Sequence, residues 1–329
     1  MLYLVTGGAG FIGSAVVRAL LQRGERVRIL DDFSTGTRAN LDGLGPALEI
    51  VAGDILEHDT LARALAGVEA VFHLAAKVSV PRSLEEPEGD LRVNAAGTLA
   101  VFQAAAKTGV RRVVYSASAA AYGDNPNLPL RESELPAPLS PYGVSKLAGE
   151  LYARLFPQAY GLETVALRYF NVYGPRQDPN SPYSGVLSRF FDALARGEAP
   201  VLLGDGAQTR DFVYVADVAE ANLRALSAPA VAVSGQVFNV GTGRSVSLRE
   251  LLEVLHTVTG RATAPRREPA RGGDIRHSCA DLTRTKAQLG FEPSWALREG
   301  LAQTWEWFCS EGQARRELDD ARRSVTAQE

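Results

Sequence analysis

Short apolar runs alternate with longer amphipathic segments through the first half of the chain. The apolar runs are four or five residues long, and we interpret them as buried β-strands over residues 2–5, 26–30, 48–51, 70–73, 112–116 and 164–168. Between them, apolar residues recur at helical spacing over residues 12–22, 60–65, 90–108 and 142–159. This alternation predicts an α/β fold, a doubly wound parallel sheet with right-handed crossovers and helices on both faces.

The pattern changes in the second half, where prolines interrupt it from residue 175 onwards. We therefore expect two domains. Residues 1–173 with about 210–243 form the sheet domain, and residues 174–209 with 244–329 form a smaller lobe. Ligands of open parallel sheets bind outside the carboxyl ends of the strands, so we expect the second part to be a C-terminal substrate-binding lobe over that edge.

Composition narrows the function classes. The 329 residues are 46% hydrophobic and carry a net charge of -3 without any basic segment, so nucleic acid is not an expected partner. Only Cys279 and Cys309 are present, which excludes a disulfide scaffold and a multi-cysteine metal site and favours a reducing compartment. Since no apolar stretch is long enough to span a membrane and no signal peptide precedes the first strand, we expect a cytoplasmic protein without a membrane or metal partner.

A glycine-rich turn separates the first predicted strand from the first predicted helix. Gly7, Gly10 and Gly13 are spaced G-x-x-G-x-x-G, with Phe11 and Ile12 opening the helix. Glycines permit a tight turn and let a pyrophosphate approach the free N–H groups of a helix N-terminus. The turn predicts a dinucleotide-binding (Rossmann) domain.

Acidic residues at two strand ends strengthen this prediction. Asp31 ends the second strand, where a carboxylate accepts hydrogen bonds from the adenosine ribose and repels a 2′-phosphate, which favours NAD over NADP. Asp54 and Ile55 follow the third strand, where the adenine ring is expected. The alternative is that these aspartates only terminate strands.

Three residues suggest proton-transfer chemistry. Ser118 follows the fifth strand, and Tyr142 and Lys146 are one turn apart at the start of a helix. A free phenol, with a pKa of about 10, is a poor base at neutral pH, but neighbouring positive charge favours the phenolate. Tyr142 is therefore the candidate general base, with Lys146 as its activator and Ser118 as a hydrogen-bonding partner of the same substrate oxygen.

Five motifs together resemble the extended short-chain dehydrogenase/reductase superfamily, in its nucleotide-sugar branch of UDP-sugar 4-epimerases. They occur in order over residues 6–13, 73–76, 116–123, 142–146 and 168–175. The resemblance implies a permanently held NAD, a UDP-sugar substrate bound between the lobes, and a homodimer. It implies further cofactor contacts at Leu74, Ala75 and Ala76, and substrate contacts at Ser79, Asn171, Arg210, Arg271, Asp274 and Ser278.

The residues after Ser118 discriminate between reactions of this branch. Members similar to dehydratases carry an acid pair there, and members similar to decarboxylases carry a glutamate, whereas this chain has Ala119 and Ala120. The resemblance therefore implies C4 epimerisation of a UDP-hexose through a transient 4-keto intermediate.

The sugar is predicted from one position. In the family, the residue at the place of Ser278 faces the sugar, and a small residue leaves room for an N-acetyl group. We expect UDP-N-acetylglucosamine/UDP-N-acetylgalactosamine, with activity on UDP-glucose/UDP-galactose also open. The alternatives are a UDP-glucuronate 4-epimerase, a strict UDP-glucose 4-epimerase, an NADP-dependent reductase, which Asp31 disfavours, and a non-catalytic NAD-binding regulator, which the presence of Tyr142 and Lys146 disfavours.

Overall fold

The computed structural model describes residues 1–177, 186–269 and 275–310. Its centre is a seven-stranded sheet in the order β10-β6-β5-β4-β1-β2-β3, in which every neighbouring pair is parallel. The strands are β1 (Leu2–Thr6), β2 (Arg26–Asp31), β3 (Leu48–Ala52), β4 (Ala70–His73), β5 (Arg112–Ser118), β6 (Glu163–Tyr169) and β10 (Gln236–Val240). The predicted α/β fold class is confirmed, and each predicted strand is present to within two residues at either end.

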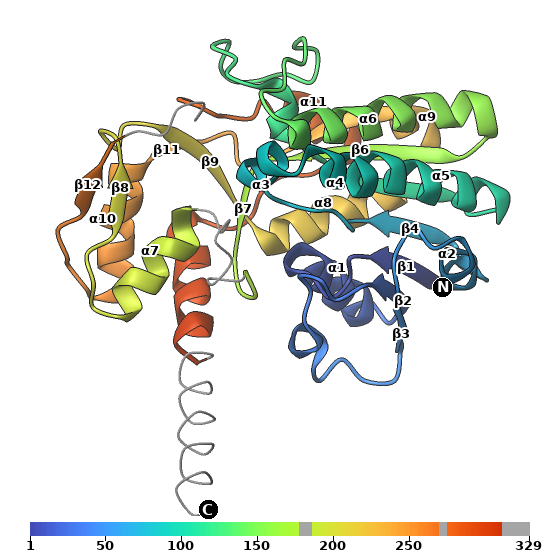
Figure 1. Cartoon of the computed structure of the whole chain (residues 1–329), viewed down its shortest axis with the longest axis horizontal. Helices are drawn as coiled ribbons and strands as arrows, with labels where there is room; N and C mark the ends of the chain where they lie inside the picture. Colours follow the sequence, from blue (N-terminus) through green and yellow to red (C-terminus); the bar gives the residue numbers. More distant parts are fainter. Residues whose placement is uncertain (178–185, 270–274, 311–329) are drawn as a thin grey trace, which may run out of the picture.

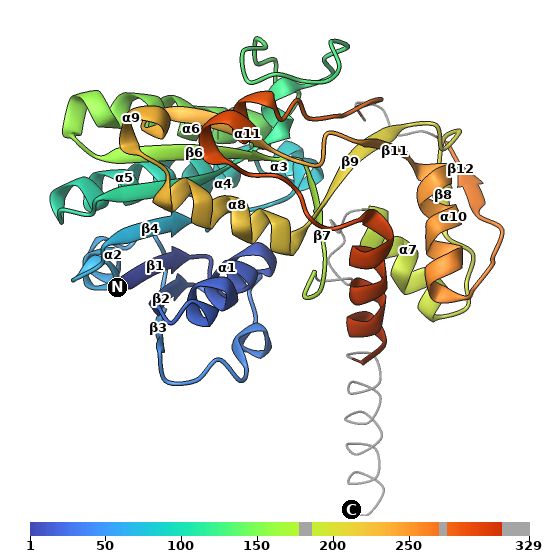
Figure 2. The same cartoon turned by 180° about the vertical axis from the view of Figure 1, so that it is seen from behind.

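Helices cover both faces of this sheet (Figures 1 and 2). On one face α1 (Phe11–Gln22) and α8 (Val215–Ser227) pack in a core that includes Val5 and Ile29. On the other, α2 (His58–Leu65), α5 (Thr98–Lys107) and α6 (Pro141–Tyr160) pack in a core that includes Leu4 and Leu30. Successive residues of β1, and Ile29 and Leu30 of β2, thus serve opposite cores, which explains why apolar residues follow one another directly there.

The helix predicted over residues 90–108 is divided. After α3 (Val80–Glu85) come α4 (Pro87–Asp90), the π-helix η2 (Leu91–Gly97) and then α5. Polar side chains hold the widened turn: Asn94 bonds the backbone of Lys77, and the Thr98 hydroxyl donates to the Asn94 carbonyl oxygen at 2.6 Å. The pattern of apolar residues does not reveal these side-chain bonds, so the sequence predicted one continuous helix. Turns of π-helix are frequent at functional sites.

The remaining elements include two small sheets outside the central one. One has the order β11-β9-β7, and the other pairs β12 with β8 in parallel. Their strands are β7 (Asn171–Tyr173), β8 (Val201–Leu203), β9 (Thr209–Tyr214), β11 (Ser245–Ser247) and β12 (Arg266–Glu268). Helices α7 (Val186–Ala195), α10 (Leu248–Thr259) and the helical residues 297–310 pack around them in a separate core (Figure 1).

Four short elements complete the described structure. They are the 3-10 helices η1 (Arg38–Leu41) and η3 (Ala119–Tyr122), and the helices α9 (Ala230–Val233) and α11 (Thr283–Leu289). Throughout the described ranges, no helix is both long enough and apolar enough to cross a membrane.

Candidate active site

The glycine turn between β1 and α1 forms a cradle that side chains would fill. Gly7 has a positive φ of 69°, and a Cβ there would lie 2.7 Å from the Ala75 backbone nitrogen. A Cβ on Gly13 would collide with the Gly7 carbonyl oxygen. Gly10 precedes the first turn of α1 without any side-chain cap, so the N–H groups of Phe11 and Ile12 begin a helix that an anion can cap. The cradle fits a dinucleotide pyrophosphate.

Asp31 at the end of β2 supports this turn. Its buried carboxylate accepts hydrogen bonds from the Ala9 nitrogen at 2.8 Å and the Phe33 nitrogen at 2.9 Å. Burial raises the pKa of Asp31 above its ordinary value, and the hydrogen bonds from the two N–H donors offset only part of this increase. Asp54 accepts from the Leu56 nitrogen at 2.9 Å, and Ile55 is buried in the core below. The two acidic strand ends therefore lie at the same edge of the sheet as the glycine turn.

The segment after β4 lies against the end of β1. The Leu74 nitrogen donates to the Thr6 carbonyl oxygen at 3.1 Å, and the Ala75 nitrogen donates to the Thr6 hydroxyl at 3.3 Å. Leu74, Ala75 and Ala76 are each half-buried beside the glycine turn. Three of the candidate cofactor segments thus meet at one edge, as the parallel topology requires.

Ser118, Tyr142 and Lys146 come together at the carboxyl end of β5. Helix α6 begins next to this strand because Ser140 caps it, accepting from the Gly143 nitrogen at 3.2 Å, and Pro141 occupies its first turn. Tyr142 is buried, and the Lys146 ammonium lies 6.0 Å from the centre of its ring. The ammonium donates to the Ser116 carbonyl oxygen at 2.7 Å, so β5 holds it in place.

The pKa values of this group are set mainly by burial. Burial raises the pKa of Tyr142 to about 12, and the Ser118 hydroxyl, which hydrogen-bonds the phenol, acts in the opposite direction. Burial lowers the pKa of Lys146 to about 8, against the carboxylates of Asp90 and Glu150, which raise it. The lysine therefore carries its proton at neutral pH, while the phenol needs additional positive charge to lose its own.

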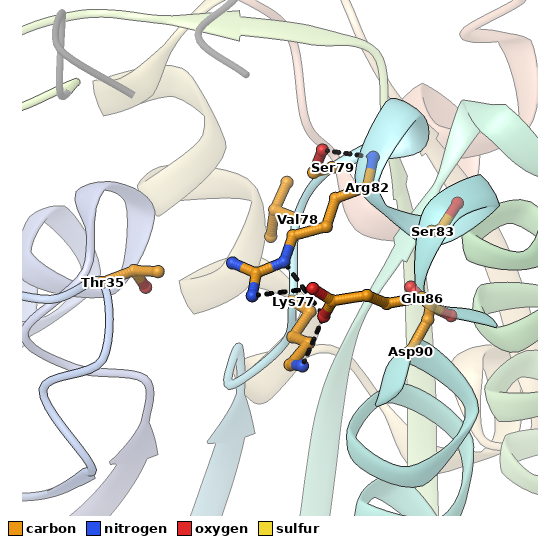
Figure 3. A pocket seen from close by; sticks show the side chains of 8 residues that line it. All are labelled: Thr35, Lys77, Val78, Ser79, Arg82, Ser83, Glu86 and Asp90. Carbon is orange, nitrogen blue, oxygen red and sulfur yellow. Dashed lines mark hydrogen bonds and ion pairs between the residues drawn. The ribbon is translucent and has the colours of Figure 1, made fainter. Parts of the chain in front are cut away.

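A pocket opens between the loop after β2 and helix α3 (Figure 3). Lys77 and Arg82 both reach the Glu86 carboxylate, at 3.7 and 3.2 Å. The Ser79 hydroxyl caps α3 by accepting from the Arg82 nitrogen at 3.1 Å. The buried Asp90 also lines this pocket.

Of the other candidate substrate residues, three lie within the described part of the chain. Asn171 is exposed at the start of β7, and Arg210 is half-buried in β9, donating to the Thr209 carbonyl oxygen at 2.8 Å. Arg271 and Asp274 lie outside the described residues. Ser278 is buried, and its carbonyl oxygen accepts from the Ser245 hydroxyl at 3.1 Å.

Asp211 fixes the segment that carries Ser278. Its buried carboxylate accepts from the backbone nitrogens of Thr242 at 2.7 Å, Gly243 at 2.9 Å and Ala280 at 3.0 Å, and from the Thr242 hydroxyl at 2.6 Å. One side chain of β9 therefore ties together the loop after β10 and the chain around Ser278.

Sequence reasoning missed the buried polar residues that support the site. Asp90 and Asn94 flank the cofactor edge, Glu150 lies one turn beyond Lys146 and pairs with Arg168, and Asp211 follows Arg210. A signal exists for some of them, because Glu150 is four residues from Lys146 on an otherwise packed helix face. Their partners come from distant segments, which no local spacing reveals.

A family model described as the NAD dependent epimerase/dehydratase family matches residues 3–241. This span covers more than half of the chain and includes the glycine turn and all three proposed catalytic residues. The chain belongs to the NAD dependent epimerase/dehydratase family. The resemblance predicted from its motifs is thereby confirmed, and NAD is its cofactor.

Individual members of the epimerase/dehydratase family match nearly the whole chain. A UDP-glucose 4-epimerase of Mycolicibacterium smegmatis is 43% identical over 315 residues, covering 94% of this chain and 99% of that protein. Among solved structures, a UDP-N-acetylglucosamine 4-epimerase from Methanobrevibacter ruminantium in complex with UDP-N-acetylmuramic acid has a TM-score of 0.89 at 41% identity, covering 94% and 98% of the two chains. A UDP-glucose 4-epimerase from Thermotoga maritima with UDP-glucose has the same TM-score and identity, covering 94% and 99%.

Proposed function

We propose that this chain is an NAD-dependent UDP-hexose 4-epimerase that interconverts UDP-N-acetylglucosamine and UDP-N-acetylgalactosamine, and also accepts UDP-glucose and UDP-galactose. The observation that carries the reaction is the grouping of Ser118, Tyr142 and Lys146 at the end of β5, next to a turn that contains no further acid. Family membership and the names of the relatives support the same reaction class.

The chain's own residues supply the proton transfer. Tyr142 takes the proton of the sugar 4′-hydroxyl and later returns it, and the Ser118 hydroxyl bonds the same oxygen. Lys146, held by the Ser116 carbonyl oxygen, keeps a positive charge near the phenol. When bound, NAD supplies the hydride acceptor and donor and a positive ring that favours the phenolate.

Elimination and decarboxylation lack their required groups. The turn η3 places Ala119 and Ala120 directly after Ser118, and neither methyl group can donate or accept a proton. This supports epimerisation over elimination and decarboxylation.

The proposed ligand contacts follow the sheet edge and the lobe facing it. NAD would be held by Gly7, Gly10, Phe11, Ile12, Gly13, Asp31, Asp54, Ile55, Leu74, Ala75 and Ala76, together with Tyr142 and Lys146. The UDP-sugar would contact Ser79, Asn171, Arg210, Arg271, Asp274 and Ser278. Arginine suits the diphosphate because its planar fork binds phosphate oxygens bidentately.

Apolar residues exposed on neighbouring helices support a homodimer. Val144, Leu151 and Leu155 are each at least half exposed on α6, and Leu91 of the adjacent π-helix is 57% exposed. On α6 these positions are separated by seven and four residues, so they form one stripe. A second copy packed on this face would remove the stripe from water.

The sugar preference is tested by a substitution at Ser278. Ser278→Tyr fills the space that the small side chain leaves, so conversion of UDP-N-acetylglucosamine should fall by about 100-fold relative to UDP-glucose, roughly 3 kcal/mol of selectivity. Wild type, Ser278→Tyr and the control Ser278→Ala are compared on UDP-N-acetylglucosamine, UDP-glucose and UDP-glucuronate by NMR of the products.

Each result has one meaning. Unchanged conversion of the N-acetylated sugar by Ser278→Tyr would contradict the role of Ser278. Turnover of UDP-glucose alone by the wild type would identify a strict UDP-glucose 4-epimerase, and turnover of UDP-glucuronate alone would identify a UDP-glucuronate 4-epimerase. Bound NAD without turnover of any of the three would contradict these substrates and favour a different nucleotide sugar or a regulator.

A further inference from the structure

We propose that Asp90 is a positioning residue for the Tyr142–Lys146 pair: it is the buried counter-ion that keeps Lys146 charged and holds the chain segment beside it. This inference rests on the proposed function, because it concerns the residues to which that function assigns proton transfer.

Asp90 is a buried carboxylate at an unusual point of the fold. It is the last residue of α4, immediately before the π-helix η2, and is 2% exposed. Its Oδ2 accepts from the Asn94 amide at 2.8 Å, and within the described residues its buried Oδ1 has no hydrogen-bond partner. A buried carboxylate with an unused oxygen is costly, so its retention needs a compensating charge nearby.

Through Asn94, Asp90 also holds the segment after β4. The Asn94 amide accepts from the Lys77 nitrogen at 2.8 Å and donates to the Lys77 carbonyl oxygen at 2.9 Å. Asp90 accepts from the same amide group, which fixes the orientation of the Asn94 side chain. The carboxylate therefore positions the chain that continues from Leu74–Ala76 to the pocket drawn in Figure 3.

The groups around Lys146 leave Asp90 as the uncompensated charge. From β4, His73 is neutral, since burial lowers its pKa to about 3; from β5 and α6, burial raises the pKa of Tyr115 and Tyr142, so both phenols are uncharged. The negative charges that act on Lys146 are therefore the carboxylates of Asp90 and Glu150.

Glu150 of α6 forms a bidentate pair with Arg168 of β6, at 2.8 and 2.7 Å, with both side chains 3% exposed. This pairing neutralises Glu150. Asp90 has no such ion pair in the described part of the chain, and α4 and η2 pack directly against α6. Lys77, which lines the same pocket, is paired with Glu86 at 3.7 Å. The cation that Asp90 compensates is therefore Lys146.

The direction of the effect follows from the sign of the charge. Asp90 raises the pKa of Lys146, against burial, and it also raises the pKa of Tyr142. Removing the charge lowers both pKa values. Activity needs a protonated Lys146 and a deprotonated Tyr142, so both limbs of its pH profile should move to lower pH. A residue with only a packing role would lower the activity without moving the limbs.

The experiment titrates Lys146 directly in the full-length protein as purified. The chain has four lysines, Lys77, Lys107, Lys146 and Lys286, so ¹³Cε-lysine labelling gives four resonances, and Lys146→Arg identifies the one from Lys146. The wild-type midpoint should be about 8. Asp90→Asn keeps the shape of the side chain and its hydrogen bond to Asn94. In this variant the Lys146 midpoint should fall by roughly one pH unit, and the pH profile of kcat should move to lower pH as well.

Glu86→Gln is the matched control, because Glu86 lines the same pocket but is half exposed and paired with Arg82 and Lys77. It should leave the Lys146 midpoint unchanged, and Asp90→Glu should keep it near the wild-type value. If Asp90→Asn does not fold, Asp90→Ser takes its place. An unmoved midpoint in the folded, charge-removed variant would overturn the proposal. Because the titration needs no substrate, a wild-type protein inactive on every UDP-sugar would contradict the proposed function alone.

Discussion

The two halves of the molecule build their parts of the site in different ways. In the sheet half, seven parallel strands end at one edge, and the glycine turn after β1 packs against the backbone after β4 and is bonded by the Asp31 carboxylate of β2. In the lobe half, by which we mean the two small sheets, β7 and β9 included, and the elements around them, the sheets have two or three strands, and side-chain bonds such as those of Asp211 connect distant loops. The first half positions its ligand by topology, and the second by a few buried polar contacts.

This difference has consequences for substitution. Around the glycine turn Gly7 and Gly13 leave no room for a Cβ, and the Asp31 carboxylate bonds the backbone of the turn. Around Ser278 the geometry depends on individual carboxylates and hydroxyls. Tyr142 and Lys146 combine both features. The regular helix α6 fixes their positions, and buried charges change their pKa values.

The largest expected effect is on the chemistry at Tyr142. Tyr142→Phe removes the proton acceptor and keeps the ring, so kcat should fall about 1000-fold. NAD binding should persist, because the cradle is untouched. The control is Tyr160→Phe, an exposed position at the other end of α6, which should retain activity. Undiminished turnover by Tyr142→Phe would remove this residue from its proposed role.

The next effect tests the sheet half. Gly13→Ala places a methyl group against the Gly7 carbonyl oxygen, and the turn must open to accommodate it. We expect NAD affinity to fall by about 10- to 100-fold, equivalent to roughly 1–3 kcal/mol of overpacking. Gly43→Ala, at a positive φ with open space around it, should lower stability without changing affinity. Calorimetric titration with NAD distinguishes the two variants.

The lobe half is tested at Asp211. Asp211→Asn replaces an acceptor with an N–H₂ group facing backbone N–H groups, so it should cost about 1–3 kcal/mol of unfolding free energy. KM for the UDP-sugar should rise, since the Ser278 segment loses its anchor, while NAD affinity should stay unchanged. Asp59→Asn, at a position of α2 whose side chain is 97% exposed, is the control. An equal loss of NAD affinity would show that the two halves are not independent.

The contrast between the halves also explains what the sequence could predict. Strand runs such as residues 70–73 and the glycine turn are local patterns, and both are present as expected. The division of the helix over residues 90–108 depends on Asn94 reaching back to Lys77, seventeen residues earlier, which no periodicity encodes. Likewise, the sequence indicates that Lys146 is near Tyr142, but the bond that holds its ammonium comes from the backbone of β5.

The last effect is on stability alone and concerns a buried histidine of the sheet half. His73 bonds the hydroxyls of Thr6 and Thr98, and burial lowers its pKa to about 3. The unfolded chain binds the His73 proton near pH 6.5, so this residue's contribution to stability is complete above that pH and is lost as pH falls from there towards 3. The loss is up to about 1.4 kcal/mol per pH unit.

Urea unfolding of the wild type and of His73→Gln between pH 7 and pH 4 measures this contribution. The variant should show a shallower dependence on pH, whereas His58→Gln, at an exposed position, should follow the wild type. Equal slopes for wild type and His73→Gln would mean that His73 takes up its proton without unfolding.

The central claim is that C4 of the sugar gives its hydrogen to bound NAD as hydride and regains it, while Tyr142 takes and returns the proton of the 4′-hydroxyl, with no elimination. The most direct measurement incubates the wild-type enzyme with UDP-N-acetylglucosamine deuterated at C4 and analyses the product by NMR. The account predicts UDP-N-acetylgalactosamine with the deuterium still at C4. Loss of the label to solvent, or a dehydrated or decarboxylated sugar as product, would contradict it.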